Sequence, residues 1–238
     1  MALIITGHQR LLAEYPYCYC CDRPKTSREH VPPLCFFPDE KKNGEAKYRK
    51  NLIRVPSCDL HNTRKSDDDF YAAFHLASTI RGNHCAKLVR DGAIARVIER
   101  DHRERGSALS LRLLKQIKGK IGVNYYGQLD VARMVRVLEL CARGVYFYEN
   151  VQPLKVKLNV ANLDFDLRDL AKKELLDKQR QSFNEEVKGC EFKGANPDVF
   201  KYRICEKPEK GVVVIEMVFY GSLHRWAFHA PDMPPQRL

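Results

Sequence analysis

Four residues spaced in two matched pairs carry metal-ligand chemistry. Cys18 and Cys21 are separated by two residues, and so are Cys58 and His61. Structural zinc takes four tetrahedral ligands, usually Cys and His. Two such pairs in a segment rich in Pro, Gly and charge predict one structural zinc ion held by all four side chains. Buried, reduced cysteines are the alternative, and Cys20 leaves the pairing within the first stretch open because it offers shorter spacings.

A second set of groups lies beside the two pairs. Glu29 and His30 follow the first pair, and Asn62 comes directly after the second. A neutral imidazole accepts a proton near pH 7, whereas carboxylate and amide oxygens suit Mg²⁺. Phosphodiester hydrolysis needs both an activated water and a Lewis acid. In an extended Glu29-His30 the two side chains point to opposite faces. A Glu-His pair alone is usually structural, so this one gains its meaning from its position between the zinc pairs.

Taken together, these residues resemble the HNH, or ββα-metal, endonuclease family with an embedded zinc knuckle. The resemblance covers about residues 18–70. It rests on the motifs Cys18-x-x-Cys21, Arg28-Glu29-His30-Val31-Pro32-Pro33, Asn51-Leu52, Cys58-x-x-His61-Asn62 and Lys65. The family implies a two-stranded hairpin and one helix around a single divalent cation.

The resemblance also implies roles for individual residues. His30 matches the general base that activates water, and Asn51 matches the residue that orients this base. Glu29 and Asn62 match the ligands of a catalytic Mg²⁺ or Mn²⁺. Glu29 stands where Asp is more usual, and its side chain is one methylene longer.

Two points in the second stretch stay open. His61 and Asn62 are adjacent, so their roles in zinc binding and catalysis are interchangeable at this stage. Arg64 and Lys65 follow about one turn later and are candidates for phosphate contact. Three acids come next and would either reach the metal or, more simply, favour a helix start: Asp67, Asp68 and Asp69.

Charge points to a polyanionic partner. The chain has 238 residues, a net charge of +11 and a pI near 9.2. The excess is concentrated in residues 84–120, with ten Lys and Arg against four Asp and Glu, a net charge of +6. Nucleic acid is favoured over a membrane, because no basic amphipathic helix with an aromatic face is evident. Arg96, Arg100 and Arg103 are candidates for backbone contact, and a solvated helical face is the alternative.

The expected compartment and the expected state of the cysteines are consistent with each other. The sequence has no apolar run of about 18 residues and no signal peptide at its start, so a cytoplasmic protein without a membrane span is expected. Nine cysteines without such a signal do not indicate a disulfide framework. Five scattered cysteines are predicted to be small core residues: Cys35, Cys85, Cys141, Cys190 and Cys205.

The patterns around these motifs predict an α+β fold. Residues 51–55 read as a strand ended by Pro56, and Ser66 is expected to cap a helix ending near Gly82. Asp130 is expected to cap a helix that ends at Arg143 before Gly144. Further helices are predicted over 84–102, 109–117 and 163–187, and strands over 145–148, 156–160, 200–204, 211–220 and 223–228, the last two as a hairpin.

Three regions follow from these elements. Residues 1–82 are predicted to form a zinc-stapled ββα-metal module, residues 83–144 a basic helical region, and residues 145–238 an α+β region with antiparallel strands. The function predicted is a metal-dependent HNH endonuclease, with DNA as the expected substrate. A zinc-containing nucleic-acid-binding protein without hydrolytic activity, or a ribonuclease using the same site, are the alternatives. A protein partner or homo-oligomer stays open.

Overall fold

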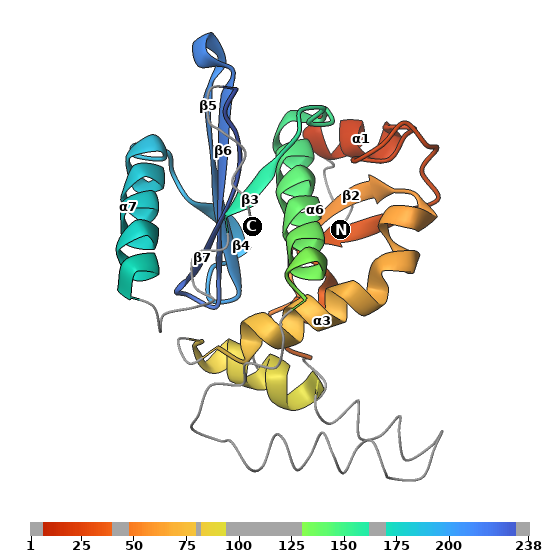
Figure 1. Ribbon diagram of the computed structural model, residues 1–238. Helices are drawn as coiled ribbons and strands as arrows, with labels where there is room; N and C mark the ends of the chain where they lie inside the picture. The colour runs from red at the N-terminus through yellow and green to blue at the C-terminus, as the bar shows by residue number, and fades with distance from the viewer. Residues whose placement is uncertain (1–6, 40–47, 80–81, 94–129, 162–169, 232–238) are drawn as a thin grey trace.

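The computed structural model describes residues 7–39, 48–79, 82–93, 130–161 and 170–231 (Figure 1). Helices and antiparallel strands are both present, so the predicted α+β class is confirmed. Within the described residues the α-helices are α1 (Gly7–Glu14), α3 (Ser66–Ala77), α6 (Val131–Asn150) and α7 (Leu170–Glu186), and residues 84–93 are also helical. The strands are β1 (Ser27–Val31), β2 (Ile53–Ser57), β3 (Asn159–Ala161), β4 (Lys193–Asn196), β5 (Phe200–Lys207), β6 (Val212–Phe219) and β7 (Leu223–His229).

The strands form two sheets. β1 and β2 pair antiparallel, with His30 opposite Arg54. The other five strands form an antiparallel sheet in the order β3-β7-β6-β5-β4. The predicted hairpin near the C-terminus is confirmed as β6 and β7, which pair from Phe219–Leu223 to Val213–His229.

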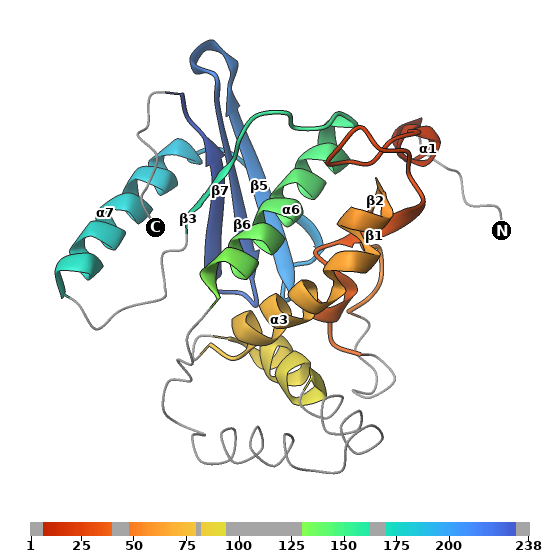
Figure 2. The ribbon, with the colours of Figure 1, turned by 45° about the vertical axis from the view of Figure 1, so that its right-hand side comes forward.

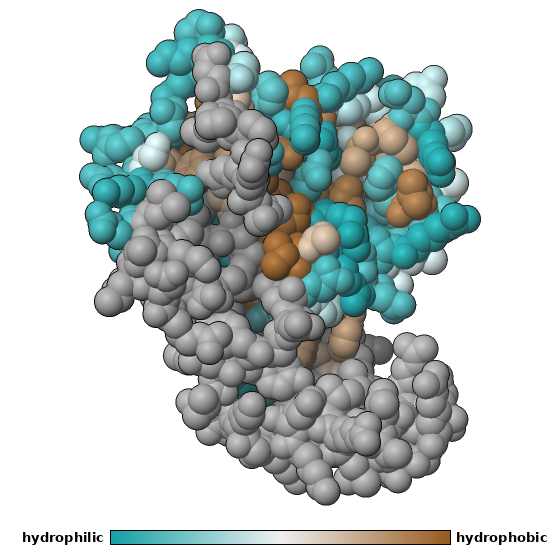
Figure 3. Space-filling view, viewed as in Figure 1, coloured by the Kyte–Doolittle hydropathy of each residue, from teal (hydrophilic) through white to brown (hydrophobic). Residues whose placement is uncertain are grey.

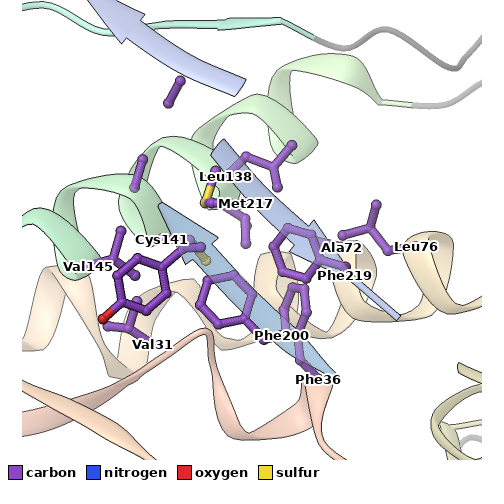
Figure 4. Packing of buried hydrophobic residues seen from close by; sticks show 14 of the residues in the cluster. Val31, Phe36, Ala72, Leu76, Leu138, Cys141, Val145, Phe200, Met217 and Phe219 are labelled. Carbon is purple, nitrogen blue, oxygen red and sulfur yellow. The ribbon is translucent and has the colours of Figure 1, made fainter. Parts of the chain in front are cut away.

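Helix α6 lies between the two sheets, and α7 covers the opposite face of the larger sheet (Figures 1 and 2). One hydrophobic cluster joins the β1–β2 pair, α3, α6 and the near face of the larger sheet. Figure 4 shows Val31 of β1 beneath Cys141 and Val145 of α6. A second cluster packs Phe183 of α7 against Trp226 and other residues of the far face. The small sheet therefore rests on α6, whose other side rests on the larger sheet.

Helix α6 begins as predicted and ends later. The Asp130 side chain accepts a hydrogen bond of 3.0 Å from the backbone N–H of Arg133, which confirms the predicted cap. The helix continues through Gly144 to Asn150, so the strand predicted at 145–148 is wrong. Gly144 instead allows close packing, because a Cβ there would lie 2.6 Å from Val31 Cγ2. The helix also crosses the predicted region boundary after residue 144.

Other element boundaries differ from prediction near the site. β2 continues through Pro56, which an edge position permits because proline has no N–H to donate. α3 begins at Ser66, but Lys65 is its N-cap residue and no side-chain cap bond forms. It ends at Ala77, before Gly82. Residues 7–14, where no element was predicted, are helical, and β4 was not predicted either.

The remaining predictions are met in part. The described residues 84–93 are helical, whereas the rest of the predicted helix over 84–102 and the one over 109–117 lie outside the described residues. β3 overlaps the end of the strand predicted at 156–160, and α7 falls within the helix predicted at 163–187. β5 covers the strand predicted at 200–204 and extends it. No described helix is both long enough and apolar enough to cross a membrane.

The single cysteines divide into two groups. Cys85 and Cys141 are buried and Cys35 is half-buried, in keeping with the predicted packing role. Cys205 is also buried, in the second hydrophobic cluster, and Cys190 packs against that cluster. These two cysteines form a disulfide with a Cα–Cα distance of 6.1 Å, which was not predicted. The segment after α7 brings Cys190 alongside β5, and this contact is not visible from the sequence spacing.

Candidate metal centre and hydrolytic site

Local turns bring the two ligand pairs together. The Cys18 N–H donates to the Arg23 carbonyl oxygen at 2.8 Å, which closes the loop that holds Cys18 and Cys21. The 3₁₀ turn Asp59–His61 starts directly after Cys58, and the His61 N–H donates to the Cys58 carbonyl oxygen at 3.1 Å. Each pair is thus folded back on itself, so both side chains of a pair face the same point.

The four ligand atoms form one compact group. His61 Nδ1 lies 3.5 Å from the sulfurs of Cys18 and Cys21 and 3.4 Å from that of Cys58, while the Cys21 and Cys58 sulfurs are 3.8 Å apart. All four atoms lie within 4.8 Å of one another, and Cys20 is not among them. Tetrahedral zinc, with Zn–S of about 2.3 Å and Zn–N of about 2.0 Å, requires S···S of about 3.8 Å and S···N of about 3.5 Å. The group therefore fits a metal ion such as zinc.

The β1–β2 pair and α3 follow the order of a ββα unit beside this metal centre. Tyr19, within the first ligand loop, donates its N–H to the Pro56 carbonyl oxygen of β2 at 2.8 Å. The Thr26 N–H donates to the Ser57 carbonyl oxygen at 2.9 Å. These bonds attach the ligand loop to the end of the strand pair, so a metal ion here would fix the position of both strands.

His30 lies on the outer face of β1. Its Nε2 accepts a hydrogen bond of 3.0 Å from Nε of Arg54, the residue opposite it on β2. Partial burial lowers the pKa of His30, and the charges of Arg54 and Arg49 lower it further. A neutral imidazole is therefore favoured at neutral pH, with Nε2 as the unprotonated nitrogen. Arg28 is exposed and shares this face, because side chains two apart on a strand point the same way.

Glu29 points the other way, into the protein. Its side chain is only 8% exposed, and its Oε1 accepts a hydrogen bond of 2.8 Å from Nζ of Lys65. Burial raises the pKa of Glu29 despite the opposing charge of Lys65. The predicted separation of Glu29 and His30 onto opposite faces is confirmed, and the Glu29 carboxylate, predicted to bind a catalytic cation, pairs with the ammonium group of Lys65.

Asn62 and His61 separate as the first assignment proposed. His61 joins the cysteines, whereas the Asn62 amide nitrogen donates to Ser27 Oγ at 2.8 Å and more weakly to the Arg28 carbonyl oxygen at 3.5 Å. Asn62 and Glu29 are thus engaged with different partners. Glu29 is paired with Lys65 and Asn62 with Ser27, and a catalytic Mg²⁺ or Mn²⁺ held by these two residues stays a prediction.

The other predicted site residues differ in burial and in their partners. Asn51 is exposed and lies two residues before β2, with a φ of 51°, a left-handed conformation that asparagine tolerates. Arg64 is exposed and pairs with Asp59 at 3.0 Å. Lys65, predicted to contact phosphate, is instead buried, and its ammonium group bonds the carboxylates of Glu29 and Asp69. Arg96, Arg100 and Arg103 lie outside the described residues.

Two contacts in the candidate site were not predicted from the sequence. Arg54 was treated only as part of a strand, and Asp69 only as a helix-start acid. The contact of Arg54 depends on how β1 pairs with β2, and that of Asp69 depends on how α3 packs against β1. About 20 residues separate the two strands, so the sequence alone does not specify this packing. Figure 3 shows the surface of the half of the molecule that contains the β1–β2 pair and α3. This surface is mainly hydrophilic, with small separate apolar patches.

Comparisons with models of known protein families, with curated proteins and with solved structures find no match.

Proposed function

We propose that this chain hydrolyses phosphodiester bonds in nucleic acid through an HNH-type ββα unit, with DNA as the substrate. The observation that carries the proposal is the hydrogen bond between Arg54 Nε and His30 Nε2 on the exposed face of β1 and β2. It joins a neutral base to a cation that has an affinity for phosphate. The adjacent Cys/His group supports the proposal by supplying the staple that a small two-stranded sheet requires.

The charges around His30 suit an anionic substrate. Arg28, His30 and Arg54 share the outer face, while Glu29 is turned inward. Guanidinium groups form strong charge-assisted hydrogen bonds with phosphate. A phosphodiester bound between Arg28 and Arg54 would draw the Arg54 guanidinium from His30 and release Nε2 for proton transfer.

The proposed reaction uses these three side chains in sequence. Nε2 of His30 takes a proton from a water molecule, and the resulting hydroxide attacks the phosphorus in line with the leaving oxygen. The P–O bond to that oxygen breaks as the new P–O bond forms. The electron pair stays on the leaving oxygen, which takes a proton from solvent water, and protonated His30 returns its proton to solvent. Arg28 and Arg54 stabilise the negative charge that develops on the phosphate. No step is assigned to a catalytic cation, because the Glu29 carboxylate is already paired with the ammonium group of Lys65.

Zinc has a separate, structural role in this proposal. Cys18, Cys21, Cys58 and His61 would hold it at the end of the strand pair. Binding there would contribute folding free energy, on the order of 10 kcal/mol for structural zinc in small modules.

The proposal is tested by incubating the protein with plasmid DNA and with RNA, with and without added Mg²⁺ or Mn²⁺. His30→Ala should lower the cleavage rate by about 100-fold or more while zinc content and folding persist. His229→Ala is the matched control, because this histidine lies on β7 and bonds the Lys157 carbonyl oxygen.

The outcomes separate the proposal from its alternatives. Cleavage of DNA that persists unchanged in His30→Ala would sink the assignment of the base. Tight, salt-dependent binding without any cleavage would identify a zinc-containing binding protein. Preferential cleavage of RNA in direct competition would identify a ribonuclease that uses the same groups.

A further inference from the structure

Three buried charges connect β1 to α3 behind the candidate base. Lys65 Nζ donates to Glu29 Oε1 at 2.8 Å and to Asp69 Oδ2 at 2.5 Å. All three side chains are only 8% exposed. We call this group the Lys65 bridge. It joins residues that lie 36 positions apart, so a single ammonium group holds the strand against the first turn of the helix.

The bridge cannot open without a large electrostatic cost. Burial raises the pKa of both Glu29 and Asp69, and the charge of Lys65 opposes that rise. Burial also tends to lower the pKa of Lys65, but the two carboxylates outweigh it and the net pKa is raised. The ammonium group therefore remains charged. Moving it to solvent would leave two buried carboxyl groups without their cation.

The geometry of β1 transmits this constraint to the candidate base. Glu29 and His30 are consecutive in an extended strand, so fixing the inward side chain also fixes the direction of the outward one. A small pocket, about the size of one water molecule, lies between the bridge and α6. Its lining includes Glu29, His30, Lys65 and Cys141. The strand that carries the base is thus held from behind by a charged group and, at Val31, by a close contact with Gly144 of α6.

We propose that Lys65 is a positioning residue for the hydrolytic site and does not contact the nucleic-acid phosphates. By bridging Glu29 and Asp69 it sets the orientation of β1, and through β1 that of His30. This inference rests on the proposed function for its effect on catalysis, but the constraint on His30 is a property of the fold alone.

The decisive comparison is between Lys65→Met and Arg28→Gln. Binding of a labelled DNA duplex is measured over a range of salt concentrations, and cleavage is measured under saturating DNA. Each phosphate contact contributes about 0.9 to the slope of log affinity against log salt. Arg28→Gln should reduce the slope by about that amount. Lys65→Met should keep the wild-type slope and affinity but lower kcat by about 10- to 100-fold, as expected for a displaced base.

A second variant and a second readout protect the test from loss of folding. Asp69→Asn keeps the shape of the side chain and the Lys65–Glu29 contact while it weakens the bridge. It should fold, lower kcat in the same direction and leave the salt slope unchanged. The NMR titration of His30 should also shift in Asp69→Asn.

Each result bears on one claim. A reduced salt slope in Lys65→Met, equal to that of Arg28→Gln, would overturn the positioning role in favour of phosphate contact. Wild-type kcat and an unchanged His30 titration in Asp69→Asn would also overturn it. If the wild-type protein cleaves no nucleic acid, the proposed function fails, and the His30 titration still decides whether the bridge controls this side chain.

Discussion

Gly144 of α6 faces Val31 of β1 so closely that no side chain fits between them. A Cβ at position 144 would lie 2.6 Å from Val31 Cγ2 and 2.9 Å from Cγ1. Val31 is the neighbour of His30 and is almost fully buried. The helix backbone therefore fixes the distance between α6 and β1, the strand that carries the candidate base. It does so from the side opposite the outer face.

Gly144→Ala should destabilise the protein although alanine favours helices. The helix preference is worth about 1 kcal/mol in favour of Ala. Overpacking a tight core site costs about 1–3 kcal/mol, and the β-branched Val31 has little rotamer freedom to move away. We expect a lower free energy of unfolding and slower cleavage. Urea unfolding and nuclease assays measure these effects.

Two variants isolate the cause of that loss. Gly92 is also helical, and a Cβ there meets no described atom within 4 Å, so Gly92→Ala should be neutral or stabilising. Adding Val31→Ala to Gly144→Ala should recover part of the lost stability by making room. If Gly144→Ala is as stable as Gly92→Ala, the close approach does not constrain β1.

The same glycine shows where sequence patterns mislead. A glycine after an amphipathic run normally predicts the end of a helix, and here it marks a close contact that only the tertiary structure reveals. Asp130 was predicted correctly because capping depends on local hydrogen bonds. The hairpin of β6 and β7 was predicted for the same reason: its strands are adjacent in sequence.

The same difference between local and long-range contacts decides which parts of the candidate site were predictable. The two-residue spacing of Cys18 and Cys21 and of Cys58 and His61 was sufficient to predict the metal group, because each pair is a local turn. The side-chain partners of the hydrolytic groups were not predictable. Lys65 meets Glu29, and Arg54 meets His30, only after the strands and helix have packed together.

Removing the metal should unfold the ββα unit selectively. We expect one zinc ion per chain, and a strong chelator should lower the melting temperature because the ligand group fastens the end of β1 and β2. Cys58→Ser should lose zinc. Cys20→Ser is the control, since Cys20 is in the same loop but outside the ligand group, and it should keep one zinc ion. Full zinc occupancy in Cys58→Ser would contradict the four-ligand centre.

An ion pair between α3 and α6 should make stability depend on acid pH. Asp68 accepts hydrogen bonds from Arg133 at 2.6 Å and from Arg136 at 3.2 Å. Burial tends to raise the pKa of Asp68, but the two arginines outweigh it and the pKa is lowered. The resulting stability is present above about pH 4 and is lost as pH falls through the lowered pKa.

Asp68→Asn should therefore cost about 1 kcal/mol at pH 7 and much less near pH 2.5. Urea unfolding at the two pH values measures the difference. Asp67→Asn provides the comparison, because Asp67 is exposed in the same helical turn, and its effect should be small at both values. Equal destabilisation by Asp68→Asn at both pH values would show that the interaction of Asp68 with the two arginines does not depend on its charge.

The electrostatics of His30 predict a shift in the pH dependence of cleavage. Burial and the charges of Arg54 and Arg49 lower the pKa of His30 below 6.5, so the acid limb of kcat/KM should lie below pH 6.5. Arg54→Gln removes one of these charges and should move the limb upward, toward the ordinary histidine value of about 6.5. The same substitution should raise KM, because Arg54 is also proposed to bind phosphate.

Folding should respond to the same titration. Because the pKa of His30 is lower in the folded state, the unfolded chain binds the proton more readily, and stability falls as pH drops below about 6.5. Arg54→Gln should reduce that fall. Arg64→Gln is the matched control, since Arg64 is exposed and paired with Asp59. An acid limb that stays in place in Arg54→Gln, or moves in Arg64→Gln by the same amount, would show that Arg54 does not set the protonation of His30.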